Sequence, residues 1–397
     1  MFTIIDNYLN KITMYRLVLY CLIFLSIITL PLSLLKLLPF SPLEFLYSIL
    51  ILVSVSLITN KTFAWTFDAP TNKESVYITA LILALIITPN LSEGFLHYTA
   101  FIFWAGAIAM ASKYIFAINK KHLFNPVALS VVITSLIINQ AASWWVGTIY
   151  MFPFVLITGF LIVRKIYRAD LVFNFFIASF LSIIIFGMLK GTPPLIIFYN
   201  TLFKSSVLFF AFFMLTEPLT TPPTKILRII YGVMVGVFFI PSFHIGKTFL
   251  TPEIALILGN VFSHLVSSKE KLFLKLKEKK IIANDTYEFS FLPDKKFNFT
   301  PGQYMEWTLD HSDQDDRGNR RYFTLASSPT ETELKISVKF YLKSSSFKNK
   351  LLSLNAGDLI IASECAGDFT LPLDKNKKLV FMAGGIGITP FRSMLKY

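Results

Sequence analysis

The stretch FSHLVSSKEKLFLKLK, residues 262–277, marks a change of composition in this 397-residue chain. Long hydrophobic spans precede it, whereas charged residues and alternating apolar residues follow it. Residues 1–267 contain 16 basic and 8 acidic residues, and residues 268–397 contain 21 and 16 in half the length. The two sides therefore predict two kinds of structure, a membrane sector and a water-exposed module.

Ten hydrophobic spans precede residue 268. A helix needs roughly 17–25 apolar residues to cross the hydrocarbon core, and somewhat fewer where it is short or partly interfacial. We expect helices near 17–38, 41–59, 76–90, 95–117, 124–141, 148–163, 170–189, 195–216, 226–241 and 252–267. Residues 1–267 thus predict a polytopic α-helical membrane bundle of about ten helices, and the shorter spans leave nine helices or re-entrant segments as alternatives.

The distribution of lysine and arginine predicts the orientation of these helices. If both termini face the cytoplasm, the inner loops hold eleven basic residues, whereas the outer loops hold Lys190 and Lys247, with Lys36 near a span end. Such a bias is typical of inner loops. We expect a multi-pass protein of the cell inner membrane, with both termini and the soluble module in the cytoplasm. The sequence lacks a basic stripe interleaved with aromatic residues, so it does not predict a nucleic-acid partner.

The cysteines and histidines do not predict a metal or haem site. Cys21 and Cys365 are the two cysteines of the chain, too few for a cysteine-rich zinc site or an iron–sulfur cluster. A membrane haem needs histidines paired across helices. His97 and His264 are the histidines expected within spans, and we place them at opposite ends of the membrane. A haem-containing reductase is therefore not expected.

Acidic residues inside a membrane sector are candidates for function. Glu44, Asp170 and Glu253 fall at span ends, where we expect solvated helix caps. Glu217 differs because it lies in FFMLTEPLTTPP, residues 212–223, where prolines and hydroxyl side chains end a helix. Two interpretations of Glu217 stay open: a helix stop, or a role as a ligand or in a quinone site.

Two short motifs give the helical half a resemblance. FNPVAL at 124–129 and the stretch 212–223 resemble the paired signatures of the NqrB/RnfD membrane family, over roughly residues 10–266. The resemblance implies a subunit of a sodium-pumping NADH:quinone reductase or an Rnf complex, with a quinone and further membrane subunits as partners. That family carries FMN on a threonine of a Ser/Thr-Gly-Ala-Thr stretch. Neither 143–148 nor 190–192 matches that pattern, so covalent FMN is not expected.

Beyond residue 268 the apolar residues recur with period two. Leu272, Leu274 and Leu276 alternate with more polar neighbours, and Phe289 and Phe291 repeat the pattern. Turn signals follow at 284–285, 293–294, 301–302, 315–319, 357–358 and 367–368. Short strands separated by such turns predict a small antiparallel β-barrel over residues 268–374.

The motif Arg321-Tyr322-Phe323-Thr324, followed by LASSP, resembles the flavin fingerprint of the ferredoxin–NADP⁺ reductase family, usually Arg-x-Tyr-Ser/Thr. The resemblance implies an FAD-binding domain in which Arg321 holds phosphate and Phe323 replaces the stacking tyrosine. Tyr322 belongs to the same cofactor-binding motif. Thr324 would be the catalytic hydroxyl near the reactive ring nitrogen. Backbone and hydroxyl donors at Ser344, Ser345 and Ser346 could meet the pyrophosphate.

Residues 379–395 predict an apolar strand, a glycine turn and the start of a helix. Glycines let the backbone approach a nucleotide, and a helix N-terminus offers amides to its phosphates. In the reductase family such a turn opens the nicotinamide domain. We expect residues 375–397 to be the truncated start of an α/β NAD(P)-binding domain in a piece of a longer protein, since such a domain needs at least about 50 residues. The expected nicotinamide-pocket residues are Gly384, Gly385, Gly387, Thr389 and Pro390.

The sequence therefore predicts a membrane-bound, FAD-dependent NAD(P)H oxidoreductase that passes electrons to a membrane acceptor such as a quinone or a bound flavin. The alternative is an ion-transporting membrane subunit of an Rnf/Nqr-like complex with a regulatory redox tail.

Overall fold

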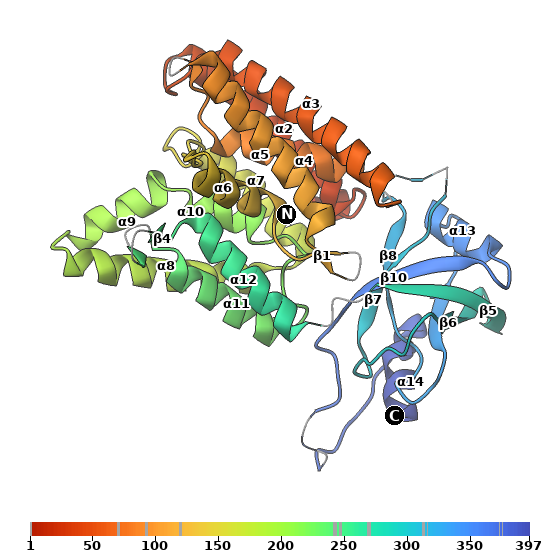
Figure 1. The fold of residues 1–397 in the computed structure, drawn as a ribbon. Helices are drawn as coiled ribbons and strands as arrows, with labels where there is room; N and C mark the ends of the chain where they lie inside the picture. Colours follow the sequence, from red (N-terminus) through yellow and green to blue (C-terminus); the bar gives the residue numbers. More distant parts are fainter. Residues whose placement is uncertain are drawn as a thin grey trace. The chain divides into compact units, whose positions relative to one another are not determined.

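The computed structural model of the chain divides into two compact units, residues 1–222 with 226–266 and residues 223–225 with 267–397 (Figure 1). It describes residues 2–69, 72–91, 94–118, 121–240, 244–245, 248–267, 271–311, 314–315, 317–372, 374 and 376–397. Lys120 and Lys247 of the orientation argument, and residues 268 and 375 at the expected domain boundaries, lie outside these ranges.

The first unit is helical. Its helices are α1 (Phe2–Leu9), α2 (Met14–Leu34), α3 (Pro42–Thr66), α4 (Lys73–Ile86), α5 (Phe95–Ile115), α6 (Pro126–Ile137), α7 (Phe152–Ile166), α8 (Ala169–Leu189), α9 (Pro194–Phe203), α10 (Val207–Phe209), α11 (Lys225–Phe238) and α12 (Pro252–Val266). A π-helical turn, Phe210–Met214, follows α10 directly. Two short hairpins pair β1 (Ala117–Ile118) with β2 (Lys121–His122) and β3 (His244–Ile245) with β4 (Thr248–Phe249).

A helix lies within each of the ten predicted spans, but the predicted count of membrane-crossing helices is not confirmed. Among the described residues, α2, α3, α5 and α8 are long and apolar enough to cross a membrane. The bent pair of α9 and Val207–Met214 makes a fifth if it counts as one span, with a bend of 59°. Helices such as α6, with 12 residues, are too short: at 1.5 Å per residue they reach well under the ~30 Å hydrocarbon core.

The helices begin where the sequence supplies caps. Ser41 and Glu44 form a reciprocal capping box at the start of α3, which confirms the role expected for Glu44. The side chain of Asn125 accepts a hydrogen bond from the N–H of Ala128 and so caps α6, whose first residue is Pro126.

The solvated caps predicted at Asp170 and Glu253 are wrong. Asp170 is largely buried and pairs with Arg228 at 2.8 Å. Glu253 is 2% exposed, and its carboxylate accepts a hydrogen bond of 2.7 Å from the indole N–H of Trp144. Because a buried carboxylate needs partners, each of these acids joins two helices or a helix and a loop that lie far apart in the sequence.

Close packing of α8 against α11 depends on small residues. A Cβ placed on Gly232 would meet the carbonyl oxygen of Leu171 at 2.7 Å, and one on Gly236 would meet that of Phe175 at 2.8 Å. Glycines four residues apart share a helix face, so the two helices approach along this strip, a packing mode typical of membrane helices.

The second unit is built on a six-stranded antiparallel sheet (Figure 1). Its order is β8-β7-β10-β5-β6-β9 within the described residues. The strands are β5 (Leu272–Ala283), β6 (Thr286–Pro293), β7 (Tyr304–Thr308), β8 (Arg320–Thr324), β9 (Leu334–Lys339) and β10 (Leu359–Ala366). Helix α13 (Ser346–Ser353) precedes β10, and the 3₁₀ turn Gly385–Ile388 leads into α14 (Thr389–Lys396).

The predicted alternation is confirmed in the core of this unit. Leu272, Leu274 and Leu276 are buried on one face of β5, and Phe289 and Phe291 are buried beside them. Such period-two burial is what a sheet with one covered face requires.

The predicted closed barrel is not formed by the described strands, since β8 and β9 lie at opposite ends of the sheet order. The two ends still approach each other just beyond β8, where the N–H of Ala326 donates to the carbonyl of Lys335 at 2.8 Å. The sheet is therefore a curled, open one whose two ends are joined by loop contacts rather than by a ladder.

Candidate flavin site and polar cluster of the helical unit

Strand β8 presents the motif at 321–324 on two faces. It pairs with β7 so that Arg321 lies opposite Trp307 and Phe323 opposite Met305. Side chains two residues apart on a strand share a face, so Arg321 and Phe323 point to one side. The ring of Phe347 lies between them, 5.4 Å from the guanidinium carbon of Arg321 and 5.9 Å from the ring of Phe323.

The guanidinium of Arg321 is fixed by its own loop. One nitrogen lies 2.6–2.9 Å from the carbonyl oxygens of Arg317, Gly318 and Arg320. Another nitrogen lies 3.2 Å from a carboxylate oxygen of Asp315. The side chain of Arg321 is 17% exposed, so these contacts hold its guanidinium in one orientation at a partly buried position.

The three predicted serines have different roles. Ser344 bonds to both backbone groups of Tyr341 and closes a turn, whereas Ser345 caps α13 by accepting from the N–H of Lys348. The N–H of Ser346 donates to the second carboxylate oxygen of Asp315 at 3.1 Å. Ser346 and Arg321 therefore hold the same anion, whereas the side chains of Ser344 and Ser345 bond to the backbone of their own turn and helix.

Asp315 was not among the predicted site residues, yet it is the centre of this arrangement. Burial would raise the pKa of its carboxyl group, but the N–H of Ser346 and the charge of Arg321 outweigh burial, so its pKa lies below the usual range. No local pattern indicates this role, since the partners come from β8 and α13. The group of donors is suited to an anion such as a phosphate.

Tyr322 and Thr324 lie on the other face of β8. The hydroxyl of Tyr322 donates to Glu306 at 2.9 Å, and its ring meets that of Tyr304 edge to face at 5.7 Å. Tyr322 is 57% exposed, and Thr324 lies opposite Tyr304 in the ladder. The structure thus brings Arg321, Phe323 and Ser346 together and separates them from Tyr322.

The glycine turn at 384–387 is open. A Cβ at Gly384, Gly385 or Gly387 would meet no other atom within 4 Å, and Gly385 adopts a φ of +54°. Thr389 donates to the carbonyl of Ile386, and Pro390 stands in the first turn of α14. An open turn leaves room for a ligand to approach the backbone.

The strand predicted before this turn is not formed. Residues 376–384 have no regular structure, and Val380 and Met382 are 83% and 84% exposed. A strand needs a neighbouring strand for its backbone hydrogen bonds. The described residues supply no such neighbour to this segment, so the expected start of an α/β domain is present only as its turn and helix.

Helix α14 packs on the segment that directly follows the flavin motif. Arg392 donates to the carbonyl of Ala326 at 2.5 Å, and the hydroxyl of Ser393 donates to the carbonyl of Ser327 at 2.6 Å. Arg392 also pairs with Glu331 at 3.1 Å. Burial would raise the pKa of Glu331, but the N–H of Ser328 and Arg392 lower it below its usual value. These contacts couple the two predicted motifs.

In the helical unit the two motif stretches meet at Glu217. The side-chain amide of Asn125 lies 2.9 Å from one carboxylate oxygen of Glu217, and Nε2 of His122 lies 3.1 Å from the other. The backbone N–H of Asn125 donates to Asn260 at 2.7 Å, and Asn260 donates to the hydroxyl of Tyr231 at 3.2 Å. This polar cluster joins the start of α6, the loop after the π-helical turn, α11 and α12.

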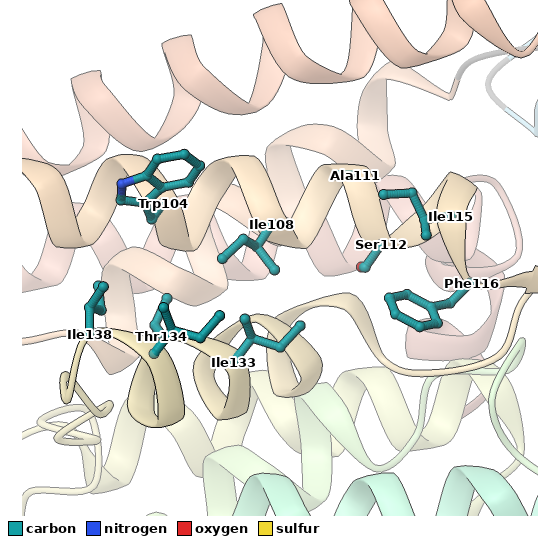
Figure 2. Close-up of a pocket in the computed structure, with 10 residues that line it drawn as sticks. Trp104, Ile108, Ala111, Ser112, Ile115, Phe116, Ile133, Thr134 and Ile138 are labelled. Atoms are coloured by element: carbon teal, nitrogen blue, oxygen red, sulfur yellow. The ribbon is translucent and has the colours of Figure 1, made fainter.

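An apolar groove of about 520 Å³ lies between α5 and α6 (Figure 2). Figure 2 shows Trp104, Ile108 and Phe116 of the α5 side facing Ile133 of α6. Its hydroxyl groups, on Ser112 and Thr134, donate to carbonyls of their own helices. The groove is therefore suited to hydrocarbon rather than to a polar group.

Comparison with known proteins bears on both units. A family model described as the NQR2, RnfD, RnfE family matches residues 134–271. A flavohemoprotein of Bacillus thuringiensis subsp. konkukian (strain 97-27) is 32% identical over 129 residues, 30% of this chain and 31% of that protein. This chain joins an NqrB/RnfD-type segment to a ferredoxin–NADP⁺ reductase-like module.

Other relatives are similar over a comparable length. The sulfhydrogenase 2 subunit gamma of Pyrococcus furiosus is 30% identical over 135 residues, 33% of this chain and 39% of that protein. The solved structure of Amycolatopsis cytochrome P450 reductase GcoB gives a TM-score of 0.30 at 26% identity, over 32% of this chain and 39% of that one. The chain spans about a third of the length of the curated relatives it matches.

The family match covers Glu217, Tyr231 and Asn260 but begins after Asn125. With its apolar helices, the NqrB/RnfD-type segment is that of a multi-pass membrane protein. Sequence analysis singled out Glu217 but missed His122, Tyr231 and Asn260. Their spacing along the chain carries no signal, because the cluster forms only when four segments fold together.

Proposed function

We propose that this chain is a membrane-bound flavoprotein oxidoreductase that passes electrons from NAD(P)H through FAD to a membrane acceptor such as a quinone or a bound flavin. One observation carries the proposal: Arg321 and the N–H of Ser346 hold a single carboxylate beside the aromatic rings of Phe323 and Phe347. These donors suit the phosphate of a flavin, and the partly exposed ring of Phe323, which packs on the fully buried Phe347, suits its ring system. The similarity to flavohemoproteins supports it.

The residues would act as binding and orienting groups. Arg321 would fork onto the flavin phosphate, with Ser344–Ser346 supplying further donors. Phe323 would cover the ring system. Thr324 lies on the face opposite Phe323, so its hydroxyl would reach the reactive ring nitrogen around the end of β8. Tyr322 lies on the opposite face of β8, so it would contact FAD only at the edge of the strand. Bound FAD would supply the redox chemistry, since a flavin can take part in both two-electron and one-electron transfers.

The glycine turn would start the nicotinamide site. Gly384, Gly385 and Gly387 leave their backbone open, and Thr389 and Pro390 begin the helix whose N-terminus would face the donor's phosphates. We further propose a membrane domain over 1–267, an FAD-binding domain over 268–374 and the start of an NAD(P)-binding domain over 375–397. We also propose that the soluble module and both termini lie in the cytoplasm, because the loops on that side of the membrane carry most of the lysines and arginines of the helical unit.

The acceptor side would lie in the helical unit. Glu217, held by Asn125 and His122, is the polar group that we propose for a ligand or quinone ring. The α5–α6 groove suits an apolar tail. Further membrane subunits are proposed as partners, and covalent FMN is not, since the threonine pattern is missing.

The test is the visible absorbance of the full chain purified in detergent. We expect flavin bands in the purified protein and bleaching by NADH or NADPH. Arg321→Ala should lose the flavin, whereas the control Arg320→Ala, which removes the same side chain from the opposite face of β8, should keep it. A colourless wild-type protein that takes up no added flavin would reject the proposal.

The alternative, an ion-transporting subunit with a regulatory redox tail, gains support from the partly buried Glu217 of the polar cluster. Ion flux in proteoliposomes separates the two proposals. Flux that is the same with and without NAD(P)H would favour the transporter, and flux or electron transfer that requires the donor would favour the oxidoreductase.

A further inference from the structure

We propose that Asp315 is a built-in competitor of the flavin phosphate, a carboxylate that occupies the anion position until the cofactor displaces it. This inference rests on the proposed flavin function and concerns how that same site is loaded. It arises from contacts that the sequence motif did not predict.

The contacts of Asp315 match those of a bound phosphate group. One carboxylate oxygen lies 3.2 Å from the guanidinium of Arg321 and the other lies 3.1 Å from the N–H of Ser346. A guanidinium and a free amide at a helix start are the donors that proteins use for phosphates. Both donors assigned to the cofactor are thus already bound to a negative charge of the chain itself.

The carboxylate is held in place by its own loop. The backbone N–H of Arg317 donates to it at 3.0 Å, and the N–H of Asp315 itself donates to the hydroxyl of Ser346 at 2.9 Å. The guanidinium of Arg317 adds a longer contact of 3.4 Å. These bonds hold residues 315 and 317 against the start of α13.

Arg321 does not need Asp315 to keep its orientation. Its other nitrogen is fixed by the carbonyl oxygens of Arg317, Gly318 and Arg320. When a phosphate takes the place of the carboxylate, the guanidinium stays in position and exchanges one anion for another. Asp315 then has to leave, because two anions cannot share the same pair of donors without strong repulsion.

The competition predicts a selectivity among flavins. FAD and FMN carry phosphate and must displace Asp315, whereas riboflavin has no phosphate and leaves it in place. Removing the charge of Asp315 should therefore strengthen binding of FAD and FMN and leave riboflavin unaffected. A residue that merely oriented Arg321 would have the opposite effect, since its loss would weaken binding of the phosphorylated flavins.

The experiment measures dissociation constants of FAD, FMN and riboflavin by flavin fluorescence on the full chain, stripped of flavin, in detergent. Asp315→Asn keeps the size of the side chain and removes its charge. We expect it to bind FAD and FMN about tenfold more tightly than wild type, the scale of one charge-assisted hydrogen bond. Asp310→Asn, the same change at an exposed position just before this loop, should bind like wild type.

A second measurement covers the case in which Asp315→Asn does not fold. In the wild-type protein, FAD should speed hydrogen exchange at the N–H of Arg317, which loses the carboxylate, while the N–H of Ser346 stays protected by its new partner. If wild type binds FAD but Asp315→Asn binds it with equal or lower affinity, the competition is wrong and the proposed function stands. The same conclusion follows if FAD binds and leaves the hydrogen exchange of the Arg317 N–H unchanged. Absence of flavin binding in both proteins would overturn the proposed function and, with it, this inference.

Discussion

The side-chain amide nitrogen of Asn125 lies 2.9 Å from a carboxylate oxygen of Glu217, across 92 residues of sequence. Asn125 also caps α6 with its side-chain oxygen and donates its backbone N–H to Asn260. One side chain therefore fixes the start of a helix, and the same residue anchors the loop after the π-helical turn and α12. The two stretches that resembled family signatures meet, in the fold, in one polar cluster.

The hydrogen bond between Asn125 and Glu217 predicts that a negative charge at position 125 lowers the stability of the helical unit. Asn125→Asp removes the donor to Glu217 and faces one carboxylate with another, so we expect it to lower the stability of the helical unit by about 2 kcal/mol. Thermal unfolding of the full chain in detergent measures the change. Asn10→Asp, the same substitution at an exposed position in the turn after α1, is the control and should leave the midpoint unchanged. Equal midpoints for both variants would contradict the prediction.

A second prediction concerns Gly302, whose φ is +97°. A Cβ there would lie 2.0 Å from the carbonyl oxygen of Phe369, whereas one on Gly357, at φ +98°, would come no nearer than 3.7 Å to another residue. Both alanine variants carry backbone strain of about 1 kcal/mol. Gly302→Ala should in addition force the 302 turn away from Phe369, so its destabilisation should exceed that of Gly357→Ala by at least about 1 kcal/mol.

The measurement is hydrogen exchange of the β10 and 367–371 amides in the two alanine variants. Faster exchange in Gly302→Ala than in Gly357→Ala is the expected result. If the two variants exchange alike, steric contact with Phe369 is not what limits position 302.

The attachment of α14 gives a third prediction. Arg392→Gln removes the pairing with Glu331 and weakens the bond to the carbonyl of Ala326. We expect at least tenfold faster hydrogen exchange in residues 389–396, because the helix of eight residues depends on tertiary contacts. Lys396→Gln, on an exposed position of the same helix, should exchange like wild type. Protection that is unchanged in Arg392→Gln would show that Ser393 and the apolar contacts suffice.

A fourth prediction concerns pH. The pKa of Glu331 is lowered in the folded chain, so its ionised form stabilises the docked helix above the unfolded value of about 4.3. That contribution is lost as the pH falls through the lower, folded pKa. Wild type should therefore protect α14 better than Glu331→Gln at pH 7, and the difference should vanish at acidic pH. A difference that persists after this carboxyl group has been protonated would mean that charge at Glu331 is not its source.

Local patterns predicted much of this molecule. Helices lie in all ten apolar ranges, and the alternation at Leu272–Leu276 gave the buried face of β5. Hydropathy did not give helix length: α6 stops at Ile137, so an apolar range proved too short to span a bilayer unaided. The strand predicted around Val380 failed because a strand depends on a neighbour, which no local pattern supplies.

The parts of the site that sequence reasoning missed are contacts between residues of different segments. Asp315 meets Arg321 and Ser346 only because the fold brings the start of α13 next to residue 315. In the same way, Glu253 was predicted to be a solvated cap, whereas in the fold it accepts a hydrogen bond from Trp144, 109 residues earlier. Charged residues are predictable from the sequence as candidates, but their partners are set by the tertiary fold.

The docking of α14 has a consequence for how the two motifs move. Ser393 and Arg392 are bonded to the carbonyls of Ser327 and Ala326, and only Leu325 separates this segment from the end of β8. These two bonds therefore pass a displacement of β8 on to α14. Under the proposed function, the flavin and the nicotinamide would fluctuate in phase, so their separation would vary less than the position of either one.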